Sequence, residues 1–319
     1  MIKVLDPSYD IFLSATWPPD NNHGICGHIY EIFDYYFILS RQYKTGIFIG
    51  EDFKWNEIES ILVDKYNVSR DEISDIKRHT FFASRPKIVK GKNILFVDGG
   101  LSRNFQHFGI KLIFDNILAF KCSCLDTFYN LHYQNVTLLQ DNRVYKCTPK
   151  DIDIAVDYRK KILFSKLKPV EVTESDTALL YCTKNCRAIS DENLSQMPRL
   201  YPKFKKFIVI TSFPEVYTDK FKHISELVFP SAPVSDLFNM FSTYIYTPTT
   251  TMFDCSPRFI AECKFYGKDV IYHNIDTAYL EVDTGLKYRK LDIDIDINLV
   301  SLRNDDSIVN IIQHVCFNT

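Results

Sequence analysis

A segment near the carboxyl end of the chain places an arginine and a glutamate four residues apart at the start of an expected helix. Ser256 is a suitable N-cap, Pro257 suits the first helical position, and Gly267 ends the helix before an apolar run. The free N–H groups of such a helix, together with Arg258, could hold a diphosphate, while Glu262 could accept hydrogen bonds from ribose hydroxyls. The pattern therefore suits a nucleotide diphosphate, but an exposed i,i+4 ion pair on an ordinary helix would have the same sequence.

A second carboxylate follows an expected strand in the first half of the chain. Asp98 comes directly after the apolar run 93–97 and is followed by two glycines. A carboxylate at the end of a strand can act as a general base that takes the proton from an attacking hydroxyl. An aspartate before glycines can equally cap a turn. Arg103 and His107 come shortly afterwards and could hold an acceptor phosphate or lie on the surface.

The chain alternates expected strands and helices in two halves, which is the pattern of parallel sheets in α/β proteins. In the first half the expected strands are 10–16, 45–49, 93–97, 111–121 and 136–140, and the expected helices are 25–41 and 55–66. In the second half the expected strands are 177–182, 207–211, 227–229, 244–247 and 270–272, and the expected helices are 190–197, 234–241, 257–266 and 305–314. A basic segment that ends at Pro169 is the expected linker. We therefore expect two Rossmann-like domains, residues 1–168 and residues 169–319.

Two such domains would face each other across a cleft at the carboxyl ends of their strands, where ligands bind. The common phosphate-binding fingerprints are absent from the sequence. Gly24 and Gly27 stand in a loop longer than G-x-G-x-x-G requires, and G-x-x-x-x-G-K-[ST] does not occur. This disfavours a dinucleotide-dependent dehydrogenase and a P-loop kinase.

The composition is that of a soluble globular protein, with 46% hydrophobic residues, 24% charged residues and a net charge of −2. The sequence contains no apolar run of the roughly 18 residues that a membrane span needs, and residues 1–10 do not resemble a signal peptide, so we expect a cytoplasmic protein that does not enter membranes. The nine cysteines are expected to be reduced, and their spacing argues against structural zinc. The balanced charge does not indicate nucleic-acid binding, although a locally basic surface could still hold DNA.

The order of features in the second half resembles GT-B glycosyltransferases, in particular the phage enzymes that glucosylate hydroxymethylcytosine in DNA. The loop after the first strand of this half carries Lys184 and Arg187, where that family holds the donor diphosphate with basic residues. The turn after its third strand carries Ser231 and Ala232, where the family recognises uracil through the backbone.

The same resemblance assigns roles to the residues that could do chemistry. Arg258 and Glu262 fall where the family places its pyrophosphate arginine and its ribose glutamate. Ser256 caps that helix at its phosphate-binding end, and Asp254 would lie near the sugar. Asp98 ends a strand that reads Leu-Phe-Val-Asp, similar to the Leu-Phe-x-Asp of the family's catalytic aspartate.

The resemblance implies inverting transfer of a sugar from a UDP-sugar to a hydroxyl, with hydroxymethylated pyrimidines of double-stranded DNA as the acceptor. It implies no metal ligand from the protein and leaves open a divalent cation that assists turnover. We expect a monomer. Two other interpretations stay open: a GT-B transferase that acts on a polysaccharide or small metabolite, and a non-catalytic two-lobed protein that binds a ligand.

Overall fold

The structure is a computed structural model of the 319-residue chain. The residues that it describes are 2–15, 27–50, 55–83, 87–97, 111–120, 135–140, 155–158, 166–171, 176–181, 191–211, 224–228, 234–246, 258–273, 279–281, 287–289 and 307–318.

The first half of the chain forms an eight-stranded sheet in which neighbouring strands are parallel. Along the sheet the order is β4-β3-β2-β5-β6-β7-β8, and β1 pairs with the beginning of β5. The strands are β1 (Ile2–Val4), β2 (Ile11–Ser14), β3 (Thr45–Gly50), β4 (Thr80–Ala83), β5 (Ile88–Phe96), β6 (Lys111–Phe120), β7 (Val136–Gln140) and β8 (Ala155–Asp157).

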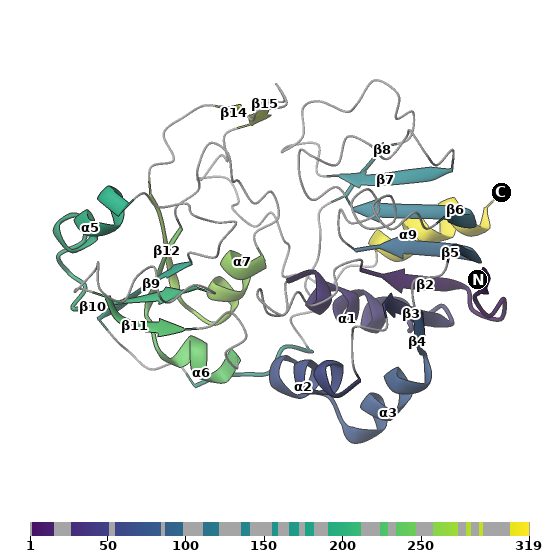
Figure 1. The fold of residues 1–319 in the computed structure, drawn as a ribbon, viewed down its shortest axis with the longest axis horizontal. Helices are drawn as coiled ribbons and strands as arrows, with labels where there is room; N and C mark the ends of the chain where they lie inside the picture. The colour runs from purple at the N-terminus through teal and green to yellow at the C-terminus, as the bar shows by residue number, and fades with distance from the viewer. Residues whose placement is uncertain are drawn as a thin grey trace.

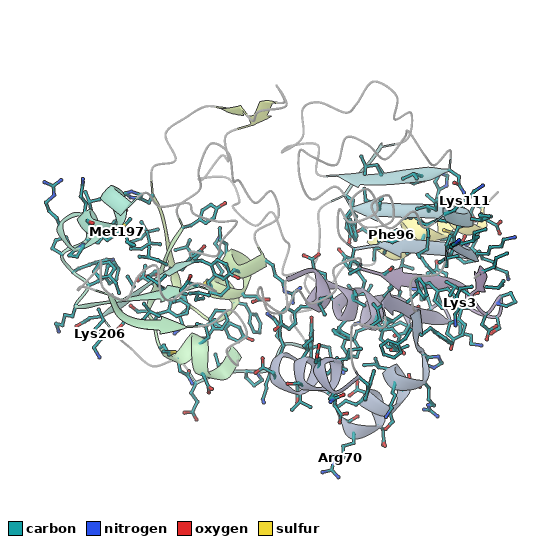
Figure 2. The ribbon with its side chains drawn as sticks, viewed as in Figure 1. Lys3, Arg70, Phe96, Lys111, Met197 and Lys206 are labelled. Carbon is teal, nitrogen blue, oxygen red and sulfur yellow. The ribbon has the colours of Figure 1, made fainter. Side chains whose placement is uncertain are left out.

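Helices cover one face of this sheet. They are α1 (Gly27–Leu39), α2 (Trp55–Lys65), α3 (Arg70–Arg78) and, from the far end of the chain, α9 (Ser307–Ile312), and all contribute side chains to one core with strands β2, β3, β5 and β6. Strand residues on the opposite face, among them Phe12 and Phe96, form a second buried cluster with Leu5 and Tyr9. In Figure 2, Phe96 lies within the sheet, whereas Lys3 on β1 and Lys111 at the amino end of β6 lie on the side away from the second sheet.

The second half forms a five-stranded parallel sheet in the order β11-β10-β9-β12-β13. Its strands are β9 (Thr177–Tyr181), β10 (Lys206–Ile210), β11 (Ile224–Val228), β12 (Thr243–Tyr246) and β13 (Asp269–Tyr272). Helices α6 (Val234–Asn239) and α7 (Arg258–Phe265) pack on one face, and α5 (Asp191–Leu200) packs on the other. Gly267 adopts a left-handed φ of 69° after α7, as expected for a glycine that ends a helix.

Both sheets share one topology (Figure 1). Strand β2 lies in the interior of the first sheet and β9 in the interior of the second. In each sheet the next two strands of the chain are added on one side, and the strands after them are added on the other side. The direction in which strands are added therefore reverses between β2 and β5 in the first sheet and between β9 and β12 in the second. This is the order of doubly wound Rossmann-like sheets, and it confirms the α/β class expected from the sequence.

The structure differs from the sequence prediction in several elements of the first half. It adds β1, α3, β4 and β8, and it begins β5 at Ile88, five residues before the expected start. The local reason for α3 is a capping box, in which Ser69 and Glu72 satisfy each other's backbone N–H groups. Within β5, Gly91 lets the ring of Phe114 on β6 approach the backbone, where a Cβ would collide with it.

The carboxyl end of the chain returns to the first sheet, as Figure 1 shows for α9 beside β5 and β6. Ile308, Val309 and Ile312 are buried in the first core, and the Tyr43 hydroxyl donates to the Val309 carbonyl at 3.2 Å. A π-helix, η4 (Gln313–Phe317), follows α9, and β14 (Tyr279–Glu281) and β15 (Lys287–Arg289) form a separate antiparallel pair. None of the helices in the described part of the chain is long and apolar enough to cross a membrane.

Candidate functional site

The carboxyl ends of the strands at the two reversals are the places where doubly wound sheets bind ligands. In the first sheet the ends of β2 and β5 lie side by side, because Val97 N–H donates to the Ser14 carbonyl at 3.0 Å. In the second sheet β9 and β12 are paired from Thr243 to Ile245 and end at Tyr181 and Tyr246.

Most residues that the sequence predicts for the site follow these strand ends in the chain but lie outside the described residues. Asp98 follows the end of β5, and Arg103 and His107 come after it. In the second half the remaining predicted residues follow β9, β11 and β12, and they are Lys184, Arg187, Ser231, Ala232, Asp254 and Ser256. Their roles stay predictions, and the two predicted residues that the structure describes are Arg258 and Glu262.

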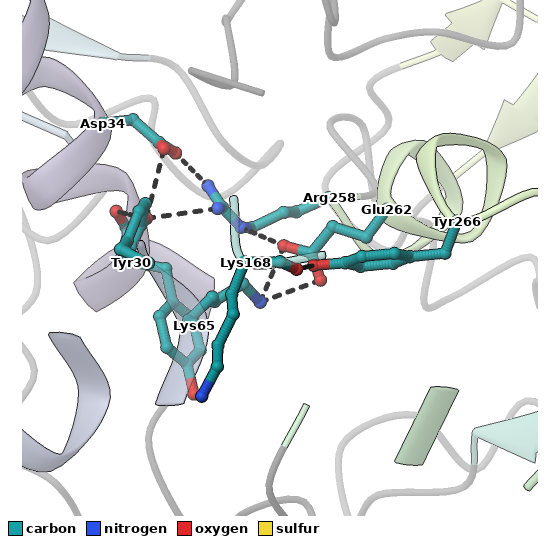
Figure 3. Close-up of polar contacts among 8 residues, drawn as sticks. Tyr30, Asp34, Lys65, Lys168, Arg258, Glu262 and Tyr266 are labelled. Carbon is teal, nitrogen blue, oxygen red and sulfur yellow. Dashed lines mark hydrogen bonds and ion pairs between the residues drawn. The ribbon is translucent and has the colours of Figure 1, made fainter. Parts of the chain in front are cut away.

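Arg258 and Glu262 lie on α7 in a buried cluster of charged side chains (Figure 3). Arg258 is 6% exposed and Glu262 is 2% exposed. Arg258 Nε donates to Glu262 Oε1 at 2.5 Å, and Arg258 Nη1 donates to the carboxylate of Asp34 on α1. The i,i+4 pair that the sequence left open as an alternative therefore forms, but it is buried and not exposed.

Two residues at the end of α2 complete the cluster. Lys65 Nζ lies 2.7 Å from Oε1 and 2.8 Å from Oε2 of Glu262. The Tyr66 hydroxyl accepts from Arg258 Nη2 at 3.3 Å and shares its own proton between the Tyr30 carbonyl (2.6 Å) and Asp34 Oδ1 (3.1 Å). The Lys65 ammonium also lies 3.9 Å from the centre of the Tyr30 ring, a cation–π contact.

The cluster connects helices of the first sheet to a helix of the second. Asp34 is 224 residues from Arg258, and Lys65 is 197 residues from Glu262. A neutral hydrogen bond lies beside these contacts, in which the Tyr266 hydroxyl donates to the Lys168 carbonyl at 3.0 Å. Figure 1 shows the same relation in the ribbon, with α7 next to α1 and between the two sheets.

Burial and neighbouring charge act on the two carboxylates with different outcomes. Burial alone would raise the pKa of Glu262, but Lys65 and Arg258 outweigh it and hold that pKa below its usual value. Burial raises the pKa of Asp34, and Arg258 opposes this shift only in part. Glu262 is thus well compensated as an anion by Lys65 and Arg258, whereas at Asp34 burial outweighs the contact with Arg258.

The pKa values of the two basic side chains shift in opposite directions. Burial would lower the pKa of Arg258, but Asp34 and the other anionic partners outweigh it and raise that pKa further. Burial lowers the pKa of Lys65, and the Glu262 carboxylate opposes this shift. Arg258 is therefore a permanent cation in the cluster, and contact with Glu262 favours the charged form of Lys65.

The residues predicted from the sequence do not include Asp34, Lys65 or Tyr66. One signal for Asp34 was present, because it stands in the apolar run of α1 and is completely buried, and a buried carboxylate needs a partner. The identity of that partner was not readable, since it comes from the other half of the chain.

A histidine that the sequence analysis did not select lies at the carboxyl edge of the second sheet. His273 follows β13, its backbone N–H donates to the Tyr246 carbonyl at 2.8 Å, and its Nδ1 is hydrogen-bonded to the Tyr201 hydroxyl at 2.8 Å. Its buried Nε2 has no hydrogen-bond partner within the part of the chain that the structure describes. Burial lowers the pKa of His273, which favours a neutral imidazole.

Within the described ranges, no group of three or more His, Cys, Asp or Glu side chains is arranged to hold a metal ion. The chemistry that the described cluster shows is buried ion pairing between Arg258, Lys65 and their carboxylate partners. Comparison with known proteins adds no assignment: no protein-family model matches the chain, and no curated protein matches its sequence.

Proposed function

We propose that the protein is a glycosyltransferase that moves a sugar from a UDP-sugar to a hydroxyl acceptor with inversion. The observation that carries the proposal is the pair of doubly wound parallel sheets with the same strand order, each with a reversal point. A transferase with a donor and an acceptor needs two binding edges, and each sheet supplies one at the carboxyl ends of its strands.

In this proposal the two sheets are the cores of the domains 1–168 and 169–319 in a GT-B arrangement. The second domain binds the donor, with Lys184, Arg187 and Arg258 at the diphosphate and Glu262 at the ribose. Asp98, which follows β5, is the general base that takes the proton from the acceptor hydroxyl. The hydroxyl then attacks the anomeric carbon from the face opposite the departing UDP.

The proposed acceptor is a hydroxymethylated pyrimidine in double-stranded DNA. The support is the resemblance of the second half to phage DNA glucosyltransferases, in the residues after β9, β11 and β12. A second candidate acceptor, a polysaccharide or small metabolite, would use the same donor site and the same base.

Ligand-induced thermal stabilisation tests the donor assignment. The purified chain is melted with UDP, UDP-glucose, ADP, free glucose and amino acids, each at matched concentration. UDP and the UDP-sugar should raise the melting temperature, since a ligand at 100 times its dissociation constant adds about 2.7 kcal/mol to the stability of the folded state. Stabilisation by free sugars or amino acids, without any by UDP, would instead favour a two-lobed binding protein and contradict the transferase.

A further inference from the structure

The ion-pair cluster leaves Arg258 with no nitrogen free of a protein partner. Its Nε, Nη1 and Nη2 contact Glu262, Asp34 and Tyr66, respectively. The cluster contains two basic side chains, Arg258 and Lys65, and two carboxylates, Asp34 and Glu262. A diphosphate that reached Arg258 in this arrangement would meet the Asp34 carboxylate already in place.

Asp34 is the partner that a ligand can most readily replace. Glu262 is on the same helix as Arg258 and is also held by Lys65, whereas Asp34 is on α1, in the other half of the chain. A carboxylate and a phosphate present the same type of oxygen acceptor to a guanidinium group. Exchange of Asp34 for a phosphate would therefore keep Arg258 paired but would break its contact with α1.

We propose that Asp34 competes with diphosphate for Arg258, so that anion binding at α7 and the ion pair between α1 and α7 exclude each other. The proposal rests on the proposed function only in taking Arg258 as the diphosphate ligand. Such coupling is reciprocal: a stronger ion pair between the halves weakens anion binding, and a bound anion weakens the contact between the halves. Asp34 is thus an internal competitor that sets the apparent affinity of the donor site.

The test uses inorganic pyrophosphate as the probe and Asp34→Asn as the variant. Asparagine has the same shape, and its oxygen can still accept from the Tyr66 hydroxyl, but it lacks the negative charge that holds Arg258. The control is Asp75→Asn, which removes the same charge from a half-exposed aspartate that pairs with Arg78 on α3. Both affinities are measured by titration calorimetry beside the wild type.

Asp34→Asn should bind pyrophosphate roughly tenfold more tightly than the wild type, because the fraction of molecules with an available Arg258 rises. Asp75→Asn should match the wild type. Equal or weaker binding by Asp34→Asn, relative to Asp75→Asn, would overturn the competition while leaving the donor site in place. No pyrophosphate binding by any of the three proteins would overturn the competition and the assignment of Arg258 to the donor site together.

A measurement on the wild type covers the case in which Asp34→Asn does not fold. Hydrogen exchange of the backbone amides in α1 and at the end of α2 is followed with and without pyrophosphate. The end of α2 serves as the reference, because Lys65 stays paired with Glu262 there. The proposal requires faster exchange near Asp34 when pyrophosphate is bound, since the contact of α1 with α7 is lost. Unchanged or slower exchange there would overturn it. Faster exchange in a protein that transfers no sugar would support the competition and contradict only the transferase.

Discussion

Replacement of Lys65 by methionine probes the energetics of the buried cluster most sharply. Lys65 is 4% exposed, and its ammonium lies within 2.8 Å of both carboxylate oxygens of Glu262. Lys65→Met keeps a long side chain but leaves the cluster with two anions and one cation. Loss of one partner from a buried ion pair costs about 3–5 kcal/mol, because the remaining charge is uncompensated. We expect a loss of this size in the free energy of unfolding.

A double-mutant cycle separates charge balance from packing. Glu262→Gln leaves two cations and one anion, whereas the double variant Lys65→Met/Glu262→Gln again has one of each, Arg258 and Asp34. The double variant should therefore be less destabilised than the sum of the two single variants, by about 1–3 kcal/mol. Urea unfolding followed by tryptophan fluorescence measures each stability, and Trp55, at the start of the helix that Lys65 ends, contributes to that signal.

The matched control is Lys166→Met, which removes a lysine from a more exposed pair. Lys166 contacts Glu72, and their side chains are 29% and 39% exposed. Partly exposed pairs contribute little, so this variant should lose less than about 1 kcal/mol. If the two single variants of the cluster combine additively, within about 0.5 kcal/mol, the reasoning from charge balance is refuted.

Two further predictions concern pH and catalysis. The pKa of Glu262 is lowered in the folded protein, so its stabilising contribution is fully present above about pH 4.5, its usual pKa, and is lost as the pH falls through the lowered value. On acidification across that range, the melting temperature of Glu262→Gln should fall less than that of the wild type. An identical dependence of melting temperature on pH in the two proteins would contradict the lowered pKa of Glu262. Asp98→Asn should bind UDP normally but transfer sugar at least roughly a hundredfold more slowly in a radiolabel assay, and near-wild-type turnover would exclude Asp98 as the general base.

The sequence predicted the layers of the fold well because local patterns carry that information. The apolar runs of β2, β9, β10 and β12 are almost entirely buried, as strands of a parallel sheet covered on both faces should be. Helix α3 was missed because its segment is polar, although its capping box was a readable helix start. Strand β4 was missed because its segment is only four residues long. In β6, exposed and buried residues alternate only over its first half, so the expected strand was correct while its partial exposure was not foreseen.

The candidate site was less predictable for a physical reason. The spacing of Arg258 and Glu262 fixes their contact with each other, because residues four apart on a helix are neighbours. Their contacts with Asp34 and Lys65 depend on how the two halves pack, and no local pattern encodes a partner about 200 residues away. No local pattern predicts a ligand of Arg258 either, because the acceptors that hold its guanidinium group come from α1 and α7 together.

The most direct test of the proposed transferase is a mass measurement of the acceptor. Duplex DNA with 5-hydroxymethylcytosine and a matched unmodified duplex are incubated with the protein and UDP-glucose. Each duplex is then digested to nucleosides, whose masses are measured by mass spectrometry. The account predicts one added hexose on the hydroxymethylated nucleoside and none on the unmodified duplex. Absence of any added hexose, with a panel of UDP-sugars and with divalent cation both present and omitted, would contradict the proposed function.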